Sequence, residues 1–197
     1  MSLKQKLSNS ILLKKDSLTS LIIILSVFGT LQMLSGGIWD ASSHALKAPE
    51  FFWSIQHVAV YTGVAMVASS AIVGFLMIKQ SQVHGIFKKG IQLIIIGAIL
   101  QIVSGYADSI SHDVFGIDGL LSWSHQPLEL GLVFGAIGAF LVLKSNPHSK
   151  LRILLPISIM TIILSIMWLG FNLFLLIGGP ILCIPVYEIF SSGCAIL

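Results

Sequence analysis

The sequence predicts an all-α polytopic membrane protein, a helical bundle with five to six spans. Of its 197 residues, 55% are hydrophobic and only 10% are charged, and the mean hydropathy is +0.96. Soluble proteins carry about 25% charged residues, so this composition is far from theirs. Because backbone polar groups inside lipid must be satisfied within the protein, and no barrel-like alternation is visible, we expect the spans to be helices.

Five apolar segments approach or exceed the ~20 residues that cross a ~30 Å hydrocarbon core. They cover residues 17–39, 52–78, 90–106, 123–143 and 151–177. A sixth segment, residues 181–197, follows the helix breaker Gly178-Gly179-Pro180 and is short, so spanning, re-entrant and interfacial placements stay open. The whole chain, residues 1–197, is expected to form one membrane domain.

Charged residues and tryptophans mark the ends of these segments. Lys14-Lys15 and Trp39 flank the first segment, and Trp53 and Lys79 flank the second. Lys88-Lys89 and Asp108 flank the third, Trp123 and Lys144 flank the fourth, and Arg152 lies at the start of the fifth. Ten of the eleven basic residues fall on one side of the predicted membrane, which places the N-terminus in the cytoplasm. The net charge of +3 follows from this topology and does not indicate nucleic-acid binding.

A spacing of one aspartate and two histidines, D-x3-H-x12-H, occurs twice. The first triplet is Asp40, His44 and His57, and the second is Asp108, His112 and His125. The flanking sequence Leu-Gln-Met-Leu-Ser-Gly at 31–36 matches Leu-Gln-Ile-Val-Ser-Gly at 100–105. We therefore expect a duplicated helical hairpin, residues 17–80 and 88–145, followed by residues 151–197. Such a parallel repeat has a pseudo-two-fold axis along the membrane normal.

Each triplet has the composition of a metal site on the outer face. Residues i and i+4 share one face of a helix, and the second histidine begins the next helix, so the three side chains are expected to converge. Imidazole suits copper, zinc, iron and nickel. Simple helix capping at the membrane edge is the alternative.

Four further residues are expected to support the triplets. They are Gln32, Gln101, Tyr61 and Glu129. Tyr61 and Glu129 each follow a histidine by four residues, and a glutamate inside a span is a functional candidate. Small residues of the second and fourth spans are expected to serve close helix contacts. They are Gly63, Ala65, Ala68, Gly131, Gly135 and Gly138.

The triplets resemble those of the C subunit of the particulate methane and ammonia monooxygenases. That family carries an Asp-x3-His-x12-His copper site and, one helix pair later, a set of Asn, His and His. Asp108 stands where the family usually has asparagine. The resemblance covers residues 30–140 and rests on spacing and topology. It implies copper at one or both triplets and a place in an oxygen-activating membrane complex, with other subunits and the lipid bilayer as partners.

Other functions stay open from the sequence. A zinc-dependent intramembrane hydrolase would lower the pKa of a bound water to about 7, with Glu129 or Asp113 as base. A b-type cytochrome would use His44 and His112, or His57 and His125, as ligands of haem iron. A non-catalytic scaffold would need no metal. The metal, the substrate, the electron donor and whether the chain is an enzyme are not determined.

Overall fold

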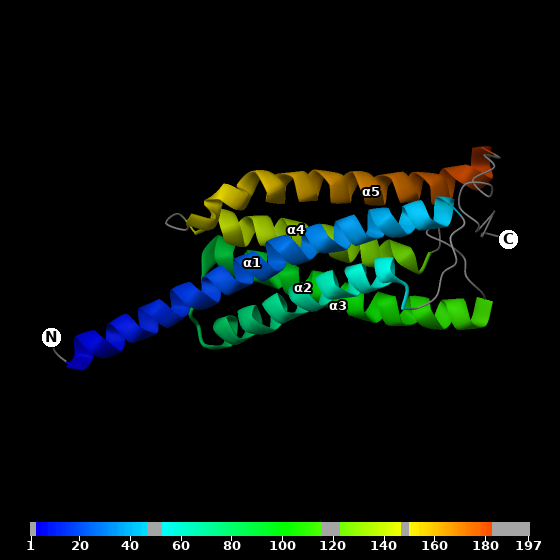
Figure 1. Cartoon of the computed structure of the whole chain (residues 1–197). Helices are drawn as coiled ribbons and strands as arrows, with labels where there is room; N and C mark the ends of the chain where they lie inside the picture. Colours follow the sequence, from blue (N-terminus) through cyan, green and yellow to red (C-terminus); the bar gives the residue numbers. More distant parts are fainter. Residues whose placement is uncertain (1–2, 47–52, 116–122, 147–149, 183–197) are drawn as a thin grey trace.

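The chain is all-helical over the residues described by a computed structural model, which are 3–46, 53–115, 123–146 and 150–182 (Figure 1). Within these ranges, the side chains of 3–14, 44–45, 111–115 and 178–182 are not described. The helices, in chain order, are α1 (Leu3–Ala45), α2 (Ile55–Lys79), α3 (Gly85–Phe115), α4 (His125–Lys144), the short 3₁₀ helix η1 (Lys150–Leu154) and α5 (Leu155–Leu182).

Five of these helices are long and apolar enough to cross a membrane, which agrees with the five predicted spans. Helices α1 and α3 continue beyond the apolar segments, so both aspartates of the repeated spacing lie on helices. Helix α5 runs through the predicted breaker at Pro180 and ends at Leu182. That interpretation was wrong because a proline in the last turn of a helix removes only one hydrogen bond. The sixth segment after Leu182 lies outside the described residues.

Helices α1 and α2 form one antiparallel hairpin, and α3 and α4 form a second (Figure 1). The hairpins meet through α2 with α3 and through α1 with α4. Helix α5 lies on the outside, against α4 and α1. The end of α1, the start of α2, the end of α3 and the start of α4 therefore lie at one end of the bundle (Figure 1).

Glycines let the helices of each hairpin approach backbone to backbone. A Cβ added to Gly63 would lie 2.7 Å from the carbonyl oxygen of Gly29, and one added to Gly131 would lie 2.9 Å from that of Gly97. The expected close contacts are confirmed at both positions. Ala65, by contrast, is exposed.

The outer surface of the bundle is apolar, unlike that of a soluble bundle, and its core is apolar as well. Large apolar side chains such as Ile72, Ile99 and Ile163 point outward, whereas small polar ones such as Thr30 and Ser70 are buried between helices. The Ser70 hydroxyl donates to the carbonyl oxygen of Ile22 on α1 at 3.1 Å. Such a surface is compatible with an integral membrane protein, because lipid solvates apolar side chains and polar groups find partners inside.

Candidate functional site

The first aspartate and the second histidine of each triplet meet across a hairpin. Asp40 lies near the end of α1, and His57 lies in the first turn of α2. The His57 Nε2 atom lies 3.0 Å from the Asp40 Oδ1 atom, and the two side chains are 24% and 9% exposed. The pair is thus largely removed from solvent.

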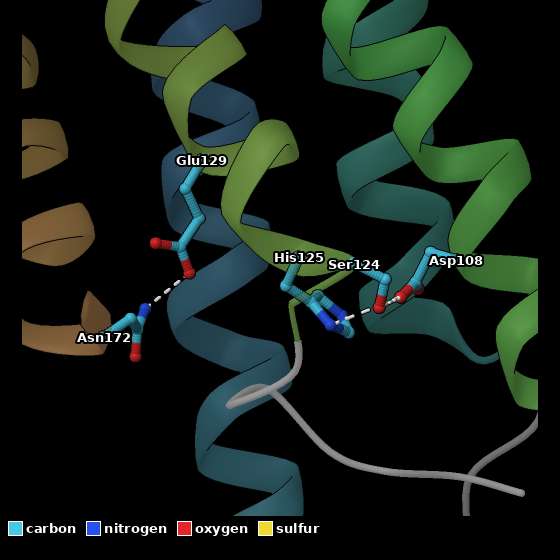
Figure 2. Close-up of polar contacts among 5 residues, drawn as sticks. All are labelled: Asp108, Ser124, His125, Glu129 and Asn172. Carbon is cyan, nitrogen blue, oxygen red and sulfur yellow. Dashed lines mark hydrogen bonds and ion pairs between the residues drawn. The ribbon is translucent and has the colours of Figure 1, made fainter. Parts of the chain in front are cut away.

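The second hairpin repeats this contact (Figure 2). The His125 Nδ1 atom lies 3.3 Å from the Asp108 Oδ1 atom, with both side chains mostly buried. The hydroxyl of Ser124 also donates to Asp108 Oδ1, at 2.5 Å. Ser124 was not among the predicted site residues, although its position directly before His125 places it at the same helix start.

The remaining histidines, His44 and His112, lie on α1 and α3, one turn beyond the aspartates. Their side chains, and that of Asp113, lie outside the described ones. Among the described side chains, no group of three or more histidine, cysteine, aspartate or glutamate residues is arranged to hold a metal. The structure therefore brings two members of each triplet together, and the third member stays a prediction.

Tyr61 lies beside the first pair, as expected from its spacing. Its ring centroid is 6.2 Å from that of His57 and 6.3 Å from that of Trp53, whose ring is nearly perpendicular to it. Tyr61 therefore lies against His57 of the first pair.

Glu129 points away from the histidine that it was expected to orient (Figure 2). Its Oε1 atom accepts a hydrogen bond from Asn172 Nδ2 on α5 at 2.5 Å. Glu129 and Asn172 are 7% and 1% exposed. This buried polar contact fastens α5 to α4. The sequence shows both residues but not that they meet.

The two glutamines of the matching hexapeptides have different environments. Gln32 is exposed, whereas Gln101 is 1% exposed. In the first hairpin Gly63 faces Met33, and in the second hairpin Gly131 faces Gln101. Gln101 follows Met33 by the same number of residues as His125 follows His57, so Met33, and not Gln32, is the structural equivalent of Gln101. A shift of one residue turns a helix by about 100°, which is why Gln32 points outward.

Comparison with known proteins adds no relative. No family model matches the chain, and neither does any curated protein or solved structure. What the two pairs do chemically is therefore inferred from their geometry.

Proposed function

We propose that this chain is a metal-binding membrane subunit that holds copper at Asp40, His44 and His57, at Asp108, His112 and His125, or at both. One observation carries the proposal. In both hairpins an aspartate and a histidine from different helices meet, at 3.0 Å and 3.3 Å. A capping role would not bring the same two residue types together from two helices in both copies.

The distances suit two ligands of one ion. Metal bonds to imidazole nitrogen and carboxylate oxygen are about 2.0–2.2 Å, so two such ligands lie about 3.0 Å apart at a right angle and about 3.4 Å apart at the tetrahedral angle. An ion between Asp40 and His57, or between Asp108 and His125, would thus need no movement of the helices. Nitrogen and oxygen donors of this kind suit copper, zinc and iron.

The arrangement around the pairs supports a third ligand from each hairpin. His44 and His112 follow the aspartates by four residues on continuous helices, which places them on the same helix face. Two imidazoles and one carboxylate leave coordination positions open. Ionisable groups at a membrane edge that are this poorly exposed are functional candidates by default.

The chain's origin and orientation belong to the same proposal. Matching glycine contacts in the two hairpins support a duplication of one helical hairpin. The basic residues at the opposite ends of the helices support an N-terminus in the cytoplasm and metal sites on the outer face.

Copper bound here would supply redox chemistry toward oxygen, as the resemblance to the methane and ammonia monooxygenase C subunit implies. This chain would hold and orient the ion through its aspartates and histidines. Other subunits of a membrane complex would complete such an oxidoreductase, together with an electron donor.

A non-catalytic scaffold is the second candidate, and one observation favours it. The Asp40 Oδ1 and His57 Nε2 atoms are already 3.0 Å apart, so the two side chains make a contact that needs no metal. The pairs would then simply fasten each hairpin at its outer end.

Metal analysis of the purified full chain tests the proposal. We expect copper with a type-2 paramagnetic resonance signal, and loss of about one copper per chain in at least one of His57→Ala and His125→Ala, according to which triplet holds copper. The matched control is His84→Ala, because His84 is exposed at the opposite end of the helices. Zinc without a signal would indicate the hydrolase, and a Soret band would indicate haem. No stoichiometric metal in the wild-type chain would refute the proposal and favour the scaffold.

A further inference from the structure

The side-chain amide of Gln101 is buried between α3 and α4. Gln101 is 1% exposed, and neither its Nε2 nor its Oε1 atom has a hydrogen-bond partner among the described residues. A buried amide without partners lowers stability, and in native proteins such groups are nearly always satisfied by protein or by ordered water. An amide with both atoms unsatisfied therefore points to a bound polar molecule.

Gln101 is the inner end of a polar column on α3. Gln101, Ser104 and Asp108 are spaced i, i+3 and i+7, which places them on one face of the helix over a length of about 10 Å. Ser104 is 7% exposed. At the outer end, Asp108 meets Ser124 and His125 of α4 (Figure 2). The column thus runs from the second aspartate–histidine pair into the interface between α3 and α4.

Gly131 of α4 makes room for the inner end. A Cβ at Gly131 would lie only 2.8 Å from Gln101 Cγ. The Gln101 side chain therefore lies over Gly131, inside the helix interface and away from lipid.

The first hairpin has an apolar surface at the same places. In the register of the helix contacts, Met33 takes the place of Gln101, and Gly36 takes the place of Ser104. Met33 is buried, and a Cβ at Gly36 would lie 2.8 Å from Val60 Cγ2. A polar column is therefore not needed to pack such a hairpin, and the second hairpin has it for another reason.

We propose that Gln101, Ser104 and Asp108 form a binding site for a small uncharged molecule that both donates and accepts hydrogen bonds, with the size of water. The Gln101 amide offers a donor and an acceptor, and the Ser104 hydroxyl offers both. Both groups are uncharged, so the inner end of the site suits a neutral ligand. The bound molecule lies beneath the Asp108–His125 pair, and its binding does not require a metal there.

Radiolytic hydroxyl labelling tests the site with water as the probe. The full chain is treated with chelator, reconstituted in lipid nanodiscs and irradiated, and the labelled side chains are identified by mass spectrometry. We expect labelling of Leu100 and Leu128, which lie beside Gly131 and Gly105, and loss of that labelling in Gln101→Met. Met33 is the internal control: it is readily oxidised, yet it is expected to stay unlabelled in a dry first hairpin. The proposal is overturned if, in the wild-type chain, Leu100 and Leu128 are labelled no more strongly than Met33.

A stability comparison keeps the proposal testable if labelling is weak. Without a ligand, Gln101→Met removes two unsatisfied polar atoms, and the Tm must rise. With a ligand, the Tm stays unchanged or falls, because bonds to that ligand are lost. Met33→Gln is the matched control, since it places an amide in the apolar hairpin and is expected to lower the Tm. A rise in the Tm of Gln101→Met overturns the proposal. Both measurements use metal-free protein, so their failure is separate from failure of the copper proposal.

Discussion

Replacing Gly97 by alanine tests how closely α3 and α4 approach. A Cβ on Gly97 would lie 2.6 Å from the Gly131 carbonyl oxygen and 2.8 Å from the Gly135 amide nitrogen. All the nearest atoms belong to the backbone of α4, so no side chain can rotate away. Because ordinary contacts are about 3.5 Å, the two helices must separate by roughly 0.5–1 Å along this stretch.

The expected loss follows from two opposing effects. Overpacking of this kind costs typically about 1–3 kcal/mol, and contacts with rigid backbone belong at the upper end. Alanine is a better helix former than glycine by about 1 kcal/mol, which offsets part of the strain. We therefore expect Gly97→Ala to lower the free energy of unfolding by about 2 kcal/mol.

This change is measured by unfolding the purified chain in mixed micelles with increasing dodecyl sulfate. The loss of helix is monitored by circular dichroism. The control is Gly37→Ala on α1, where an added Cβ would meet nothing within 4 Å. That variant keeps the gain in helix propensity without strain, so its stability is expected to be unchanged or higher. If Gly97→Ala were as stable as Gly37→Ala, the close approach of the two backbones would be refuted.

Three further outcomes follow from polar contacts between helices. Asn172→Leu leaves the buried Glu129 carboxylate without its donor and should cost about 1–3 kcal/mol in the same unfolding assay; full stability would show that the contact is not made. Ser70→Ala removes one hydrogen bond between α1 and α2 and should cost only about 0.6 kcal/mol, so a loss above 2 kcal/mol would contradict the local role. Ser124→Ala removes a hydrogen bond to Asp108, and copper titration should show about 10–100-fold weaker binding at the second site only; equal weakening at both sites would speak against it.

The five long apolar helices were predictable, because a segment that can cross a bilayer has a characteristic length and composition. The meeting of Asp40 with His57, and of Asp108 with His125, was also predictable. Each pair flanks a short connection between two antiparallel helices, which brings its two ends together. The helix ends were less predictable, since α1 and α3 extend beyond their apolar stretches and α5 continues through Pro180.

The direction of individual side chains was not predictable. The matching hexapeptides suggested that Gln32 and Gln101 are equivalent. However, the hexapeptide of the first hairpin lies one residue further from its aspartate than that of the second, so the two glutamines lie on different helix faces. Glu129 follows His125 by one turn, yet it pairs with Asn172 from a helix distant in sequence. No local spacing contains that contact.

The sequence by itself determined the helical membrane-type architecture, the two hairpins and the residues at their shared end, because hydropathy and short-range spacing are properties of the chain alone. Only the tertiary structure decided which polar groups are buried and which partner each one meets. The reason is that these depend on helix rotation and on how closely glycines let neighbouring helices approach.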